Sequence, residues 1–282
     1  MTKRAKQMNG CLWTVSLAVS VLACTIPIGC GEDEDVIHRY DKPEQKKNTT
    51  SLTDQVLHRK TQQDLEAIER ALQKGADPNG DPQRSKSPPL LDAARRGDRD
   101  VARVLIKYKA DVNATSDHPG VSGKTPLYWA VWRGDLSLAT ELLKRGADID
   151  KATMSGRTPL MVATTRGKTR AVKFLLDKGA DAKATDTSEM TSLHFSANMD
   201  EFVPITQLLA DAGADLDARN ENSQTPLYVA AFANNVKQVE LLAKLGADIN
   251  ARDSSGKTPL AMARILKNRD VVELLEKLGA KE

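Results

Sequence analysis

The feature that most constrains this chain is a pair of motifs repeated at a spacing of 33 residues. Thr-Pro-Leu begins at Thr125 and again at Thr158, and Gly-Ala-Asp begins at Gly146 and again at Gly179. Further copies of the two motifs begin at Gly75, Gly213, Gly246, Thr225 and Thr258. A fixed period of this length predicts a stack of equivalent units, because each unit can bury its apolar side chains only against its neighbours.

Each unit is expected to contain two helices. Threonine caps helix N-termini and proline fits the first helical turn, so Thr-Pro predicts the start of a first helix. Small residues such as Ala130 and Ala163 would let that helix lie close to its neighbours. Leucine pairs such as Leu142-Leu143 predict a second, apolar helix. The glycine that follows is expected to be left-handed, so Lys109 at that position is a predicted weak point.

These motifs at this spacing resemble the ankyrin repeat family, and the resemblance covers Ser51 to Glu282. It implies an all-α fold, an ankyrin-repeat α-solenoid of seven units in which hairpin loops join the helix pairs. The first unit, Ser51 to Asn79, and the last are expected to be degenerate caps, because each exposes one face to water. In the first unit only the second helix, Asp64 to Leu72, is recognisable.

Two units depart from the pattern. The hairpin between Asn113 and Thr125 is longer by four residues than the next one, so its tip, which contains His118, is expected to project. The fifth unit has one extra residue, which we place near Asn198 to Asp200 because Pro204 fits only near the start of a second helix. The sequence therefore does not define the shape of the surface at the fifth unit.

The chain begins like an export signal. Lys3, Arg4 and Lys6 precede an apolar run from Leu12 to Ala23, which is too short to span a bilayer. We therefore expect a signal segment at 1–30, a disordered polar linker at 31–50 and one repeat domain at 51–282. The expected location is a bacterial cell envelope, with the protein either lipid-anchored to a membrane or released as a periplasmic or secreted protein.

Two cysteines compete as the site of lipid attachment. Cys24 follows Val21-Leu22-Ala23, which resembles a bacterial lipobox, whereas Cys30 follows a glycine and precedes an acidic run. A signal that is removed without lipid addition, or that remains as an anchor, stays an alternative. Besides these two, the chain has only Cys11, in the same segment, so the body has no cysteine for a disulfide or a metal site.

The remaining patterns give no reason to expect catalysis. Without the three basic residues of the signal, basic and acidic residues are equal in number, which argues against nucleic acid as a partner. Gly123-Lys124-Thr125 lacks the leading glycine of a phosphate loop and opens a repeat instead. The four histidines lack metal-ligand spacing, and His194 is assigned a structural role in its turn. We expect no cofactor, no metal, no catalytic residue and no small-molecule substrate.

The resemblance implies where a partner would bind. In ankyrin repeat proteins, partners contact the hairpin tips and the variable residues after the alanines of the first helix, on the concave face. Trp132 is expected to point outward and Trp129 inward, so that Trp132→Ala would abolish partner capture without changing the melting temperature. Four arginines among these positions favour an acidic partner. The positions are Arg95, Arg96, Trp132, Arg133, Arg166, Met199, Phe232 and, at a hairpin tip, His118.

The function predicted from the sequence is a protein–protein interaction scaffold that is exported or tethered to a membrane. An immunity-type inhibitor or a host-directed effector would use the same surface, and a neighbouring toxin gene would favour it. An enzyme is disfavoured because a stack of repeats lacks a deep enclosed pocket.

Overall fold

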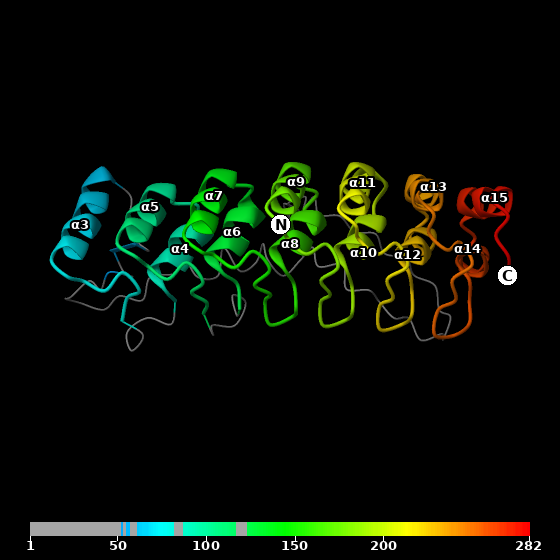
Figure 1. Cartoon of the computed structure of the whole chain (residues 1–282), viewed down its shortest axis with the longest axis horizontal. Helices are drawn as coiled ribbons and strands as arrows, with labels where there is room; N and C mark the ends of the chain where they lie inside the picture. The colour runs from blue at the N-terminus through cyan, green and yellow to red at the C-terminus, as the bar shows by residue number, and fades with distance from the viewer. Residues whose placement is uncertain (1–51, 53–54, 57–60, 82–86, 117–122) are drawn as a thin grey trace, which may run out of the picture.

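Helix pairs lie side by side along one axis in the computed structural model, which describes residues 52, 55–56, 61–81, 87–116 and 123–282 (Figure 1). Helix α3, at Gln62–Gln73, is the first whose bounds lie within the described residues, and it confirms the helix predicted in the first unit. Six pairs follow it in the described residues, so the all-α repeat architecture is confirmed. The first helices are α4 (Pro89–Arg96), α6 (Pro126–Arg133), α8 (Pro159–Thr165), α10 (Ser192–Ala197), α12 (Pro226–Phe232) and α14 (Pro259–Leu266). The second helices are α5 (Arg99–Lys107), α7 (Leu136–Lys144), α9 (Thr169–Asp177), α11 (Val203–Asp211), α13 (Val236–Leu245) and α15 (Arg269–Lys277).

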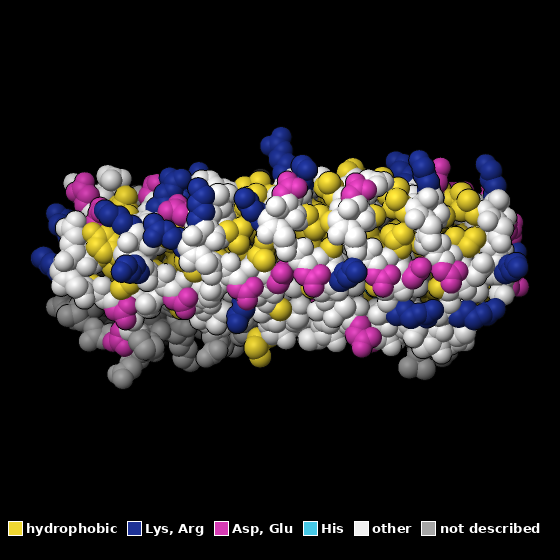
Figure 2. Space-filling model, viewed as in Figure 1, with side chains coloured by type: hydrophobic (Ala, Val, Ile, Leu, Met, Phe, Trp, Pro, Cys, Tyr) yellow, Lys and Arg dark blue, Asp and Glu magenta, His cyan; other side chains and the backbone are white. Residues whose placement is uncertain are grey.

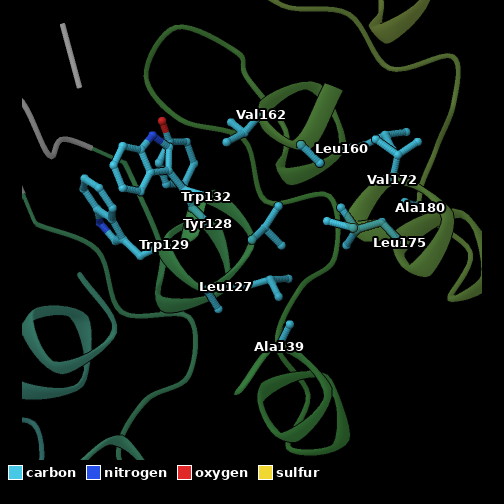
Figure 3. Packing of buried hydrophobic residues seen from close by; sticks show 14 of the residues in the cluster. Leu127, Tyr128, Trp129, Trp132, Ala139, Leu160, Val162, Val172, Leu175 and Ala180 are labelled. Atoms are coloured by element: carbon cyan, nitrogen blue, oxygen red, sulfur yellow. The ribbon is translucent and has the colours of Figure 1, made fainter. Parts of the chain in front are cut away.

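The first helices form the continuous centre of the stack. Each packs against the next first helix and against the second helix of its own pair. Leu127 of α6, Leu160 of α8 and Leu175 of α9 are fully buried, and Figure 3 shows such side chains meeting between the helices. Burying a leucine stabilises a fold by about 1.5–3 kcal/mol relative to leaving it exposed. The core therefore runs along the whole row, and no unit has a core of its own.

The threonine and glycine positions behave as predicted. Thr125 Oγ1 accepts a hydrogen bond from the backbone N–H of Tyr128 at 3.1 Å, which caps α6, and Pro126 fills its first turn. Lys109 has a φ of 65°, the left-handed conformation taken by the glycine in other units. An L residue there costs about 1–2 kcal/mol, so the structure supports Lys109 as a weak point.

Side-chain to backbone hydrogen bonds connect successive Gly-Ala-Asp turns, and we call this series of bonds the turn ladder. The residue two positions after each aspartate accepts a hydrogen bond from the backbone N–H at the aspartate position of the next unit, for example Asp181 N–H to Asp150 Oδ1 at 3.1 Å. Lys183 stands at the acceptor position before Asp215, and a lysine offers no acceptor. The other bonds of the ladder are accepted by Asn79, Asn113, Asp217 and Asn250.

Lys183→Asn should complete this ladder. We expect the free energy of unfolding to rise by about 0.5–1.5 kcal/mol, the usual net worth of one hydrogen bond, measured by urea denaturation. Lys183→Gln, whose amide is one methylene further from the backbone, is the matched control and should give less. If the asparagine variant is no more stable than the parent, the hydrogen bonds of the turn ladder do not stabilise the stack as described.

The fifth unit departs from the others at the predicted place, since the short 3₁₀ helix η1 begins at Asp200 and ends at Phe202. Pro204 lies in the first turn of α11, so both predictions are confirmed. A buried amide holds this segment to the next unit. The Gln238 Nε2 donates to the backbone oxygens of Ser196 at 2.9 Å and Met199 at 2.6 Å. Its Oε1 accepts from the Thr206 hydroxyl at 2.8 Å. The irregular backbone is therefore fixed by a fully buried side chain.

His194 braces its own turn and the following hairpin. Its Nδ1 accepts from the Thr191 backbone N–H at 3.2 Å, so its Nε2 carries the proton and donates to the Gln224 carbonyl at 2.9 Å. The structural role predicted for His194 is confirmed. In the next unit Tyr228 performs a similar task, because its hydroxyl donates to Asp253 Oδ2 at 2.7 Å. A tyrosine at this position therefore braces the turn by another route.

Burial lowers the pKa of His194, since protonation would cost desolvation and the bond to Thr191. The unfolded state, with a histidine pKa of about 6.5, then binds a proton that the folded state does not. Stability should be constant above about pH 7 and fall below about pH 6.5, by up to about 1.4 kcal/mol per pH unit. Urea denaturation from pH 5 to 8 measures this. In His194→Asn the stability should be lower throughout and this slope should be lost; an unchanged slope would contradict the assignment.

Several predictions fall outside the described part of the chain. Residues 1–51 include Cys24, Cys30 and the linker, and residues 117–122 include His118. Among the described residues, no helix combines the length and apolar character needed to cross a bilayer.

Candidate functional site

The C-terminal ends of the first helices follow one another along the stack, because these helices pack side by side. We call this line the first-helix rim. Its residues are Arg96, Arg133, Arg166, Met199, Phe232, Ile265 and Leu266. Arg96, Arg133 and Arg166 occupy equivalent positions in three successive units, at the C-terminal ends of α4, α6 and α8, and all three are exposed. We call these three residues the arginine ladder. Their helices pack side by side, so the three side chains follow one another along the rim.

Arg133 is held in place by the preceding unit. Its Nε donates to the carbonyl oxygen of Arg95 at 2.7 Å. Its guanidinium also lies over Gly97, where an added Cβ would stand only 3.1 Å from Nη1. Burial, and then the charge of Arg95, lower the pKa of Arg133. The guanidinium is thus partly desolvated beside a second cation.

Arg166 lies over the ring of Trp132 in the preceding unit, with its guanidinium carbon 4.3 Å from the ring centroid. Such stacking is worth about 0.5–2 kcal/mol and leaves the edge of the guanidinium available for hydrogen bonds. Within the described part of the chain, neither Arg133 nor Arg166 forms an ion pair.

The prediction that Trp132 points outward is wrong. Trp132 is 8% exposed and Trp129 is fully buried, and their rings meet edge to face with centroids 5.7 Å apart (Figure 3). Arg166 covers the indole of Trp132 from the next unit. Only the inward placement of Trp129 is confirmed. Trp132 is therefore a packing residue that supports the rim from beneath.

Arg95 also lies below the surface, although the sequence placed it on the contact stripe. Its side chain is 7% exposed, and its Nε lies 3.5 Å from Asp92 Oδ1. Burial raises the pKa of Asp92, and the charge of Arg95 opposes that rise. The Asp92–Arg95 pair thus belongs to the packed end of α4, and Arg96 is the exposed arginine of that unit.

The rim changes character toward the C-terminus. Phe232 is 39% exposed, Ile265 58% and Leu266 41%, and these residues end α12 and α14, which pack against each other. We call them the apolar end. Met199 lies between the two parts and is half-buried. Cations in three units are therefore followed by exposed apolar side chains in the last two.

The second helices present a different surface. The cations of α5 are paired between units: Arg99 with Asp135 at 2.8 Å, Arg103 with Glu141 at 3.4 Å and Lys107 with Glu69 at 2.7 Å. Figure 2 shows basic side chains gathered over α5 and α7 and a row of acidic side chains along the middle of that face. The cations of α5 are thus neutralised by neighbouring units, whereas Arg133 and Arg166 of the arginine ladder form no ion pair within the described residues.

The described residues contain no cluster of three or more His, Cys, Asp or Glu side chains able to hold a metal ion. An open, polar hollow is lined by the start of α5 and the end of α4, and it includes Arg96, Arg99 and Arg103. Arg99 and Arg103 already pair with Asp135 and Glu141 of the next unit. Two of the cations that line this hollow are therefore already held in ion pairs.

Comparison with known proteins bears on the repeat region. A family model described as ankyrin repeats (3 copies) matches residues 57–153, 150–220 and 193–281. Human Inversin is 35% identical over 149 residues, which cover 52% of this chain and 14% of Inversin. Human Rabankyrin-5 is 26% identical over 135 residues, which cover 48% of this chain and 9% of Rabankyrin-5. The matched part is thus a small share of either relative.

Proposed function

Because this chain belongs to the ankyrin repeat family, we propose that it is a non-enzymatic protein-binding module that contacts its partner through the first-helix rim and the adjoining hairpin tips. Ankyrin repeats are protein-interaction modules, and the two human relatives carry the same kind of repeat. The observation that carries the proposal is the rim itself. Five of the six first helices line up exposed side chains whose types, arginine and large apolar residues, are common at interfaces, and α10 contributes the half-buried Met199.

The proposed contact set consists of the exposed rim residues and the half-buried Met199. It keeps Arg96, Arg133, Arg166, Met199 and Phe232, and it adds Ile265 and Leu266, whose apolar side chains lie at equivalent places in the last unit. Trp132 and Arg95 support it from below. On the family pattern this line belongs to the concave face.

We further propose that the module is exported and tethered in a bacterial envelope. The support is in the sequence: a basic start, an apolar run and Cys24 or Cys30 in lipobox-like surroundings. Palmitate labelling of the full chain should be lost in either Cys24→Ser or Cys30→Ser and kept in the other. Labelling of neither parent nor variant would reject the lipid tether.

Site-specific photocrosslinking tests the binding function. A photoreactive residue is placed at Arg166 or Phe232 on the rim, and at Arg170 on α9 as the exposed control. In cells that make the full chain, the rim positions should give a discrete protein adduct and Arg170 should not. The proposal fails if adducts form from Arg170 as readily as from the rim, or form at none of the three positions.

A further inference from the structure

We propose that the first-helix rim holds an extended acidic segment of a partner protein, whose carboxylates recur every third residue against the arginine ladder and whose apolar side chain rests on the apolar end. This rests on the binding function proposed above and adds the class and the shape of the partner. The occupant is a polypeptide, and its chemistry follows from charge, preorganisation and spacing.

Charge complementarity selects an acidic occupant. The three exposed cations of α5 have carboxylate partners in neighbouring units, such as Asp135 for Arg99. Within the described residues, Arg133 and Arg166 have none. In the fourth unit the residue that follows Gly167 is Lys168, where the second and third units carry the capping aspartates Asp98 and Asp135. Positive charge therefore increases along the arginine ladder from the second unit to the fourth.

The guanidinium groups are preorganised to accept carboxylates. Arg133 uses its Nε on the Arg95 carbonyl and is confined over Gly97, which leaves its two terminal nitrogens to donate. The face of the Arg166 guanidinium stacks on the Trp132 ring, which leaves the N–H groups at its edge available to donate hydrogen bonds. An arginine fork matches a carboxylate with two parallel hydrogen bonds. Side chains that are already ordered lose less entropy when a partner binds.

The spacing selects an extended chain. Adjacent packed helices lie about 8–10 Å apart, which sets the distance between rungs of the ladder. A polyproline II chain rises about 3.1 Å per residue with three residues per turn, so every third side chain returns to one face after about 9 Å. Seven such residues meet all three arginines. An α-helix would need about 15 residues to do the same, because its matching positions are seven residues apart.

The apolar end sets where the occupant carries its hydrophobic side chain. Phe232 lies two units beyond Arg166, about 16–20 Å along the row on the same helix spacing. That length corresponds to about five or six extended residues. A carboxylate triplet and an apolar side chain separated by such a linker would therefore bind both parts of the rim at once.

Fluorescence anisotropy of the purified full chain with synthetic peptides tests this inference. The probe is a fluorescein-labelled peptide with glutamate at every third position of a proline background, followed after five residues by Leu-Phe. Two comparators have the same length: one gathers the three glutamates together, and one replaces them with glutamine. We expect the probe to bind at least tenfold more tightly than the glutamine peptide and at least threefold more tightly than the clustered one. Equal affinity for the probe and the glutamine peptide overturns the proposal.

Charge reversal locates the binding site. Arg133→Glu and Arg166→Glu should each weaken probe binding at least tenfold, whereas Arg170→Glu on α9, an exposed arginine off the rim, should change it less than twofold. Arg166→Gln, which is milder to the packing over Trp132, should weaken binding at least threefold and serves if a glutamate variant does not fold. Equal loss in Arg170→Glu would overturn the proposal, because it would show a nonspecific charge effect.

The chain's own acidic run, Glu32 to Asp35, is the rival occupant. If it covers the ladder, replacing its four carboxylates with amides should raise probe affinity at least tenfold, and that result overturns the assignment to a partner. Unchanged affinity supports it. If rim crosslinks form in cells but the acidic probe does not bind, the partner class is wrong and the binding function stands; if no rim crosslink forms, the function itself fails.

Discussion

Trp132→Ala is expected to lower the free energy of unfolding by about 3–5 kcal/mol, the usual cost of removing a large buried aromatic side chain. The indole is 8% exposed, meets Trp129 edge to face and lies under Arg166. Its loss leaves a cavity between the third and fourth units. The measurement is urea denaturation followed by circular dichroism, together with the melting temperature.

Trp132→Phe is the matched control. It keeps an aromatic ring beneath Arg166 and removes a buried indole N–H that has no acceptor among the described residues. We expect a loss of about 1 kcal/mol or less, because the lost volume is partly offset by removing an unsatisfied donor. If Trp132→Ala leaves the melting temperature unchanged, the indole is a surface group and the packing described above is wrong.

Gln238→Ala is expected to cost about 2–4 kcal/mol. The substitution removes the three hydrogen bonds of a fully buried amide, each worth about 0.5–1.5 kcal/mol net, and leaves a cavity, although the carbonyls of Ser196 and Met199 keep their backbone donors. It also removes one of the two acceptors within reach of the Thr206 hydroxyl, the other being Ser196 Oγ at 2.8 Å. These bonds hold the irregular backbone of the fifth unit, so hydrogen exchange should rise there, in η1 and the start of α11.

Gln238→Glu separates polarity from size. It keeps the volume and the acceptor but sets a second carboxyl oxygen against the carbonyl oxygens of Ser196 and Met199, so it should destabilise the chain at least as much as alanine at neutral pH. Gln207→Ala, whose amide bonds Asp211 at the surface of the same helix row, should change stability by less than about 0.5 kcal/mol. A Gln238→Ala variant as stable as this control would show that the network does not support the fifth unit.

The fold could be predicted from the sequence because its signals are local and periodic. Thr125 and Pro126 mark a helix start by hydrogen-bonding chemistry that needs no distant contact. The left-handed position of Lys109 follows from its place in the repeat, and the site of the extra residue follows from Pro204. Each of these residues acts within its own turn, so one unit predicts the others.

The details of the surface could not be predicted in this way. Whether Trp132 is exposed depends on Arg166, which belongs to the next unit and covers its ring. Arg95 is similarly held below the surface by its ion pair with Asp92, one helical turn before it. A clue was present, since arginine stands at equivalent positions in three successive units, and a long side chain there can reach back over the preceding one. The pattern indicated which positions vary, and packing between units decided which of them meet solvent.

We propose above all that a partner protein binds along the first-helix rim. Hydrogen-exchange mass spectrometry of the full chain, alone and with the purified partner recovered by crosslinking, tests it most directly. We predict protection at the ends of α4, α6, α8, α12 and α14, with little change in α5, α7 and α9. Protection concentrated on the second helices, with the rim unchanged, would contradict it.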